Sequence, residues 1–271
     1  MIMVAFQGER GAFSEDAAIK LFGEDIDFLP CIHLRGVFQA VLEDNVDFGV
    51  VPVESSQAGS INETYDLLLA YPLNIFAEVI LRVSHCLMAL PGENLTSVRT
   101  IYSHPQALAQ CEEFLTKLKV EAVPSYDTAG SAKMIKERQL RQCAAIASKR
   151  AANIYALEIL APEIETNVNN YTRFFAIARQ KTKPALKNKT SLVFATRNVP
   201  GALYKVLGTF ASRNINLTKL ESRPSKSKPW EYVFYTDFEG HIDSEAYQEA
   251  IKELELETTF VKVLGSYPQA E

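Results

Sequence analysis

Paired cysteines are the first feature that the sequence lacks. Its four cysteines are scattered, with no CxxC pair and no spacing typical of metal ligands: Cys31, Cys86, Cys111 and Cys143. We therefore expect neither a disulfide framework nor a metal site. The apolar start Met1–Phe6 runs directly into the polar residues Gln7–Arg10, so we also expect no signal peptide. Together these absences predict a cytoplasmic protein whose thiols stay reduced.

Long apolar runs and a strong excess of charge are also missing. The apolar stretch Val79–Leu90 is short and is broken by Arg82 and His85, so it cannot span a bilayer. The 28 Lys and Arg residues and 33 Asp and Glu residues give a formal net charge of −5. This balance offers no broad surface for nucleic acid or an anionic membrane. The 271 residues, 47% hydrophobic and 23% charged, suit a globular protein of about two domains.

A basic segment, Arg179–Lys189, divides the chain. It contains one proline and no acidic residue, which is typical of a linker, although a loop within one domain would have the same composition. After it, the hydrophobic patterns predict strand, helix, strand, strand, helix and strand at 189–197, 200–210, 215–222, 230–237, 244–254 and 258–265. Ser244 is the expected cap of the second helix. This βαββαβ order predicts a ferredoxin-like fold.

Before the basic segment, short apolar runs repeatedly precede helical patterns. The pairs are 3–6 with 14–22, 48–53 with 62–69, 100–102 with 107–118, and 143–147 with 149–160. Such alternation predicts an α/β fold with largely parallel sheets. Ligands of these folds bind at the carboxyl ends of strands, so polar residues at those ends are the candidate site residues.

Two strand ends carry polar clusters without a diagnostic motif. Gln7–Gly11 contains two glycines but matches neither the Rossmann fingerprint nor the P-loop, and an ordinary turn explains it equally well. Val51–Gly59 gathers a carboxylate, two hydroxyls and an amide. Capping of the next helix would explain Ser55 or Ser56 but not the whole cluster.

Two further strand ends offer a histidine and an arginine. Ser103 and His104 are adjacent on a strand, where they point in opposite directions, and no GxSxG motif surrounds them, so a serine hydrolase is disfavoured. Arg173 follows Thr172 and could bind a carboxylate bidentately. A structural ion pair, for example with Glu54, is the alternative for Arg173.

Four of these runs, in this order and spacing, resemble the prephenate dehydratase family: Val51–Gly59, Ser103–Cys111, Tyr126–Lys133 and Thr172–Phe174. Gly201–Leu203 together with Asn216–Pro224 is similar to the phenylalanine-binding ACT regulatory domain that follows the catalytic part in this family. The first motif lies near the start of the sequence, so we expect no preceding chorismate mutase segment and a resemblance to the monofunctional enzyme. It implies a two-lobed catalytic domain like a periplasmic binding protein at 1–180, with its second lobe at about 77–160. A linker at 181–188 and the ACT domain at 189–271 would follow.

The resemblance also assigns roles to residues. It implies that Thr172 is catalytic and that Ser55, Ser103 and Gln110 bind substrate, with His104 and Arg173 as further candidates. Ser55 stands where the family usually has asparagine, so it loses the amide carbonyl. The implied phenylalanine site consists of Gly201, Ala202, Leu203, Leu217, Thr218, Glu221, Ser222, Arg223 and Pro224. Neither a cofactor nor a metal is implied, and ligand binding between paired ACT domains implies a homodimer or homotetramer.

The implied reaction is the conversion of prephenate to phenylpyruvate, carbon dioxide and water in phenylalanine biosynthesis, under feedback by L-phenylalanine. Its barrier lies in expelling hydroxide, which a donor aimed at that oxygen would lower. We expect the Thr172 hydroxyl to donate this hydrogen bond, with His104 or a water supplying the proton. An arogenate dehydratase and a non-enzymatic amino-acid sensor remain alternatives.

Overall fold

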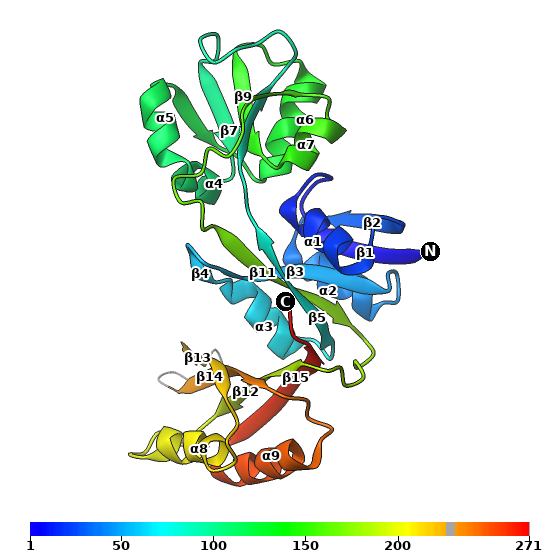
Figure 1. The fold of residues 1–271 in the computed structure, drawn as a ribbon, viewed down its shortest axis with the longest axis vertical. Coiled ribbons are helices and arrows are strands. Elements are labelled where there is room, and N and C mark those ends of the chain that lie inside the picture. The colour runs from blue at the N-terminus through cyan, green and yellow to red at the C-terminus, as the bar shows by residue number, and fades with distance from the viewer. Residues whose placement is uncertain (226–230, 271) are drawn as a thin grey trace. The chain divides into compact units, whose positions relative to one another are not determined.

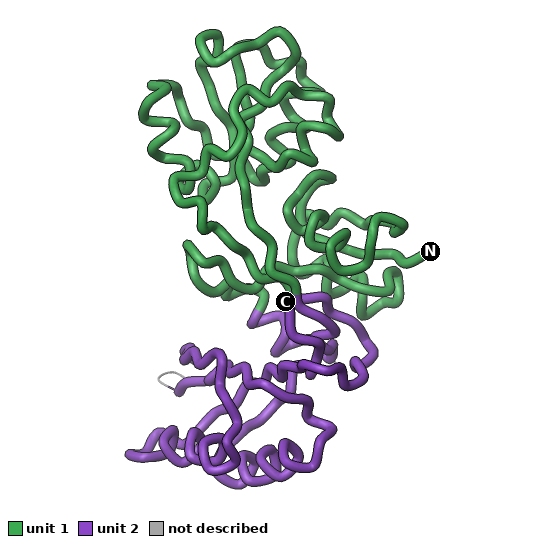
Figure 2. The backbone as a smooth tube through the Cα atoms, in the orientation of Figure 1, with its two compact units in different colours: residues 1–64, 79–174 green, residues 65–78, 175–271 purple. Residues whose placement is uncertain are grey.

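The computed structural model describes residues 1–225 and 231–270 and contains two compact units (Figure 2). One unit comprises Met1–Thr64 with Val79–Phe174, and the other comprises Tyr65–Glu78 with Phe175–Glu271. The expected domain limits at 180 and 189 stay a prediction. The clustering adds a segment from the middle of the chain, 65–78, to the C-terminal unit.

The first unit begins with strands and helices that alternate as the sequence predicts. They are β1 (Ile2–Gln7), α1 (Phe13–Phe22), β2 (Ile26–Cys31), α2 (Leu34–Leu42), β3 (Phe48–Ser55), β4 (Gly59–Ser60) and α3 (Asn62–Ala70). The strands form one sheet with β5 (Asn74–Arg82) and β11 (Tyr171–Ala178), in the order β2-β1-β3-β11-β5, and β1 is parallel to both its neighbours. Fully buried side chains such as Phe6 and Phe38 form its core. Residues 65–70 of α3, 74–78 of β5 and 175–178 of β11 belong to the second unit.

The same unit contains a second lobe with its own sheet. Its elements are β6 (Cys86–Ala89), β7 (Thr100–Ser103), α4 (Pro105–Gln110), α5 (Glu112–Leu118), β8 (Glu121–Pro124), α6 (Thr128–Arg138), β9 (Cys143–Ala147), α7 (Lys149–Ile154) and β10 (Glu158–Ala161). The strand order is β10-β6-β9-β7-β8. Helices α4 and α5 cover one face of this sheet and α6 and α7 the other, each with its own apolar cluster (Figure 1).

Two of the sequence-based elements in this lobe are wrong in detail. The helix expected at 149–160 ends at Ile154, because Ala156 has a positive φ of 48° and the chain then enters β10. The helix expected at 107–118 is divided at Cys111 into α4 and α5. The sheet is also mixed, since β6 pairs antiparallel with β9 and β10. A largely parallel arrangement therefore describes only its β9-β7-β8 part.

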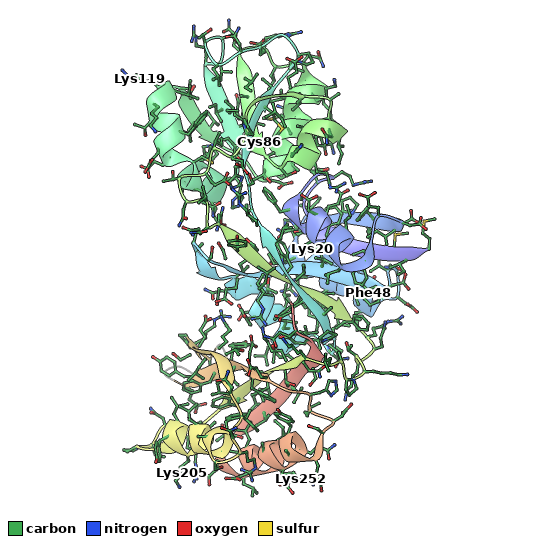
Figure 3. All side chains as sticks on the ribbon, in the orientation of Figure 1. Lys20, Phe48, Cys86, Lys119, Lys205 and Lys252 are labelled. Carbon is green, nitrogen blue, oxygen red and sulfur yellow. The ribbon has the colours of Figure 1, made fainter. Side chains whose placement is uncertain are left out.

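The second unit contains the predicted βαββαβ order. Its elements are β12 (Asn188–Ala195), α8 (Ala202–Ala211), β13 (Leu217–Pro224), β14 (Tyr232–Glu239), α9 (Glu245–Glu257) and β15 (Phe260–Pro268). The antiparallel sheet has the order β13-β14-β12-β15, and α8 and α9 lie on one of its faces (Figure 1). Lys205 and Lys252 mark the exposed side of these helices (Figure 3). The ferredoxin-like prediction is confirmed.

The edges of these elements differ from the sequence prediction in two places. Ser244 is the N-cap residue of α9, as predicted, but its hydroxyl donates to the His241 carbonyl at 3.1 Å and makes no capping bond to the helix. Trp230, with which we expected a strand to begin, lies outside the described residues. Over the described ranges, no helix is long and apolar enough to cross a membrane.

Candidate active site

A cavity of about 350 Å³ lies among strand ends in the first unit. Its walls come from the corners after β1, β2 and β3, from α4 and the segment before α6, and from Val83, His85, Thr172 and Phe174. This is the size of a small-molecule site. It is also where the rule for α/β sheets placed the candidate residues.

Thr172 and Arg173 lie on opposite faces of β11. Thr172 is half-buried and lines the cavity. Arg173 is not among the lining residues, and its guanidinium lies 3.9 Å from the Glu54 carboxylate. Successive residues of a strand point in opposite directions, so only one of this pair can face the cavity. The geometry matches the ion pair that was the alternative for Arg173, and its substrate-binding role stays a prediction.

Ser55 and Ser103 have different surroundings. Ser55 lines the cavity, and its Oγ accepts hydrogen bonds from the backbone N–H groups of Gln57 at 3.2 Å and Ala58 at 3.4 Å. Its own hydroxyl hydrogen is not used in either bond. Ser103 is fully buried, is not among the lining residues, and donates to the Ile146 carbonyl at 2.6 Å. Its expected role in substrate binding also stays a prediction.

Gln110 enters the cavity from the last residue of α4. Its side-chain oxygen lies 2.8 Å from His85 Nε2 and accepts a hydrogen bond from Asn170 Nδ2 at 3.1 Å. His85 and Asn170 are almost completely buried. Burial lowers the pKa of His85, so the ring is neutral near pH 7.

His104 is the exposed residue that precedes α4, and it also lines the cavity. Its Nδ1 accepts a hydrogen bond from the Gln106 N–H at 3.3 Å, so it caps the helix. This bond leaves Nε2 as the ring nitrogen that could exchange a proton with a ligand. The predicted role of His104 as a proton source is compatible with this position.

The two carboxylates that line the cavity, Glu9 and Asp127, already have hydrogen-bond or ion-pair partners. Glu9 forms an ion pair with Lys133 at 2.9 Å, and the hydrogen bond from this ammonium to Glu9 raises the pKa of Lys133. Asp127 accepts the backbone N–H groups of Glu9 at 3.0 Å and Gly130 at 3.2 Å. Among the described residues, neither lysine nor arginine lines the cavity. An anionic ligand would therefore depend on neutral donors there.

The corner after β1 approaches α7 closely. Ser148 donates to the Gly11 carbonyl at 2.6 Å, and Tyr155 donates to the Arg10 carbonyl at 2.9 Å. Gly11 has a φ of +89°, and a Cβ there would lie 2.7 Å from the Ala151 Cα. A side chain at this position would therefore push the two lobes apart.

The residues expected to bind phenylalanine lie in the second unit. Gly201, with a φ of +82°, directly precedes α8, which begins at Ala202. Leu217 and Thr218 line an open groove beside α8. Glu221 and Arg223, further along β13, are paired with Lys219 at 3.1 Å and Asp66 at 3.3 Å. Their roles in ligand binding stay predictions.

Sequence reasoning missed His85 and Asn170 as members of the site. His85 was visible only as a polar interruption of the apolar run Val79–Leu90, and Asn170 as an amide two positions before Thr172. The signal that could have found His85 is a single imidazole in an otherwise apolar segment. The described residues contain no group of three or more His, Cys, Asp or Glu that could hold a metal ion.

The first unit is thus a two-lobed α/β domain with a cavity of small-molecule size, and a ferredoxin-like domain follows it. Comparison with known families gives a match to prephenate dehydratase over residues 4–182 and to the ACT domain over residues 190–256. The chain belongs to the prephenate dehydratase family, whose members are carbon–oxygen lyases of aromatic amino-acid biosynthesis.

Individual proteins extend this comparison. The chain is 46% identical to arogenate dehydratase/prephenate dehydratase 2 of Arabidopsis thaliana, a chloroplastic protein, over 98% of this chain and 73% of the relative. It is similar to the L-Phe complex of prephenate dehydratase from Arthrobacter aurescens, with a TM-score of 0.90, 30% identity, and coverage of 99% and 90%. It also resembles a structure described as GqqA, a novel type of quorum quenching acylase, with a TM-score of 0.89, 34% identity, and coverage of 98% and 97%.

Proposed function

We propose that this protein is a prephenate dehydratase, which converts prephenate to phenylpyruvate, carbon dioxide and water. The observation that supports this most strongly is the convergence of Thr172, Gln110 and His104 on one cavity of about 350 Å³. These side chains come from β11, the end of α4 and the residue before α4. Hydroxyl, amide and imidazole groups are the donors that expulsion of a hydroxide leaving group requires.

In this proposal the Thr172 hydroxyl donates a hydrogen bond to the departing ring oxygen. Threonine is too weak an acid to transfer a full proton, so His104 or a water supplies it. The ring carboxylate leaves as carbon dioxide, and aromatisation drives the reaction. A cation bound tightly to that carboxylate would oppose its departure, which suits a cavity that, among the described residues, neither lysine nor arginine lines.

Arogenate is the second candidate substrate, because the Arabidopsis relative carries both activities in its name. Arogenate has an ammonium where prephenate has a keto group. The carboxylates nearest the cavity, Glu9 and Asp127, are already engaged by Lys133 and by backbone N–H groups. An ammonium would have to compete for them, so we favour prephenate.

An acylase activity is less well supported. Covalent amide hydrolysis needs an accessible nucleophile beside a base. Ser103 precedes His104 but is fully buried and donates to a backbone carbonyl. This geometry does not favour a hydrolase.

The regulatory part of the proposal is feedback inhibition by L-phenylalanine at the ACT domain, in a homodimer or homotetramer. The L-Phe complex of the Arthrobacter protein supports the ligand. Inhibition requires that phenylalanine bind the less active state more tightly. The four free thiols suit a reducing compartment, so we propose a cytoplasmic location.

Turnover of the full-length chain tests this proposal. Prephenate and arogenate are supplied separately; phenylpyruvate is measured by its absorbance in alkali and phenylalanine by chromatography. We expect product from prephenate, less with added L-phenylalanine, and a mass above that of one chain by light scattering. If the protein converted arogenate but not prephenate, arogenate would be the substrate. If it converted neither compound, the assignment as an enzyme would be overturned.

A further inference from the structure

We propose that His85 and Asn170 are positioning residues that fix the polarity of the Gln110 side-chain amide. In this arrangement the NH₂ group of Gln110, and not its carbonyl, faces the substrate. The proposal rests on the proposed function in one respect, namely that Gln110 contacts the substrate.

The hydrogen bonds to Gln110 are the first argument. An amide oxygen has two lone pairs, and here both have a partner, His85 at 2.8 Å and Asn170 at 3.1 Å. The Gln110 NH₂ group is then the end of the amide that is available to a ligand. Since neither lysine nor arginine lines the cavity among the described residues, two N–H groups at this point would bind a carboxylate or a departing oxygen.

The unpaired atoms of the two partners are the second argument. As placed, His85 Nδ1 and Asn170 Oδ1 are buried without a hydrogen-bond partner, and both are acceptors. If the Gln110 amide were reversed, it would donate to His85 Nε2 and to a reversed Asn170 carbonyl. His85 Nδ1–H and the Asn170 NH₂ group would then be buried donors without acceptors. Buried unpaired donors are rarer than under-used acceptors, so the first arrangement is favoured.

The surroundings hold the His85 ring in place. Its backbone N–H donates to Glu165 at 2.9 Å, and the ring packs edge-on against Phe13 with centroids 5.4 Å apart. Glu165 is in turn paired with Arg82 at 3.2 Å. A neutral ring with its hydrogen on Nε2 satisfies the bond to Gln110 without placing a charge in the buried site.

Both positioning residues lie on the segments that connect the two lobes. The Val83 N–H donates to the Asn170 carbonyl at 2.8 Å, and the Ile164 N–H donates to the His85 carbonyl at 3.0 Å. In Figure 1 these segments run together between β5 and β6 and toward β11. Gln110, on the second lobe, is therefore oriented by the connection between the lobes.

The ring state is tested without reference to turnover. Nitrogen-15 NMR of the full-length protein reports which ring nitrogen of His85 carries hydrogen, and the H85Q variant assigns the signal. We expect the hydrogen on Nε2 and none on Nδ1 near pH 7. A hydrogen on Nδ1 would overturn the proposal, whether or not the protein turns over prephenate.

Two substitutions at His85 separate positioning from packing. H85Q keeps an N–H group that can donate to Gln110, whereas H85L fills the space without a donor. We expect kcat/KM for prephenate to fall about tenfold to a hundredfold more in H85L than in H85Q, since a buried acceptor loses its partner. Equal losses in two variants of equal melting temperature would contradict the proposal.

Asn170→Asp adds a readout that a purely structural role would not move. An ionised carboxylate at this position cannot donate to Gln110, but a protonated carboxyl can. The ratio of variant to wild-type kcat/KM should therefore rise as the pH falls. The charged and titratable neighbours His85, Glu165 and Arg82 are present in both proteins, so the comparison is made as a ratio to the wild type. A flat ratio would overturn the role of Asn170, while a wild-type protein inactive on both substrates would overturn the proposed function instead.

Discussion

The buried polar groups beside the cavity of the first unit and those in the C-terminal sheet differ in whether they have hydrogen-bond partners. Beside the cavity of the first unit, His85 Nδ1 and Asn170 Oδ1 are buried without partners. In the C-terminal sheet, Ser191 donates to Asp237 at 2.5 Å and is bonded to Tyr267 Oη at 2.6 Å. Because the Ser191 hydrogen goes to Asp237, Tyr267 must donate to Ser191. An unpaired buried group reduces stability, whereas a closed network of hydrogen bonds holds elements together.

The largest expected effect is at Thr172. T172V keeps the shape of the side chain and removes its hydroxyl, so kcat should fall about 10²- to 10⁴-fold. T172S restores the hydroxyl and should recover most of this loss. Calorimetry should show unchanged binding of L-phenylalanine, because that site is expected in the other unit. A T172V protein with wild-type kcat would remove Thr172 from the mechanism.

The approach of the two lobes at Gly11 should affect substrate binding next. G11A places a methyl group 2.7 Å from the Ala151 Cα, and we expect KM to rise about tenfold or more as the lobes separate. G23A is the matched control, because Gly23 also has a positive φ, of +85°, but a Cβ there has no atom within 4 Å. Both variants place an alanine at a positive φ and so share the same kind of backbone strain. Similar KM values would therefore show that the contact with Ala151 is unimportant.

The closed network of the C-terminal sheet should appear in stability. S191A leaves Asp237 and Tyr267 each without one hydrogen bond, so the free energy of unfolding of this unit should fall by about 1–3 kcal/mol. S212A removes an exposed hydroxyl and should change it by less than about 0.5 kcal/mol. Urea unfolding followed by circular dichroism measures both, and equal values would show that the network contributes little.

The smallest effect concerns pH. Burial places the folded-state pKa of His85 below its unfolded value of about 6.5, so the unfolded chain binds more protons below that pH. Stability should therefore fall as the pH is lowered through 6.5, by at most about 1.4 kcal/mol between pH 7.5 and 5.5 from this residue. H85Q should lose less stability than the wild type over that range in thermal melts. Identical losses would mean that His85 does not resist protonation.

Local patterns in the sequence predict much of the fold but only part of the site. Periodicity identifies the six elements from β12 to β15, because the apolar residues of each recur with the period of a helix or a strand. It fails at residues 149–160, where the helix ends before Ala156. Alanine favours helices, so nothing in the local sequence indicates the positive φ of this residue. The motifs identify Gln110 and Thr172, but the partners of Gln110 are separated from it by 25 and 60 positions. Only the folded connection between the lobes brings His85 and Asn170 to it.

The assignment of residues 65–78 to the C-terminal unit determines where this protein can be joined to a relative in a chimera. Within that unit, the buried Glu78 carboxylate pairs with Lys189 at 2.8 Å and accepts the Ala270 N–H at 3.0 Å. A Cβ on Gly265 would meet the Ile75 backbone at 2.4 Å, so strand β15 fits only a residue without a side chain there. A chimera joined in the basic segment would carry Glu78 and Ile75 to a foreign sheet. The boundary for recombination is therefore not the linker, and a transplanted regulatory domain would need residues 65–78 with it.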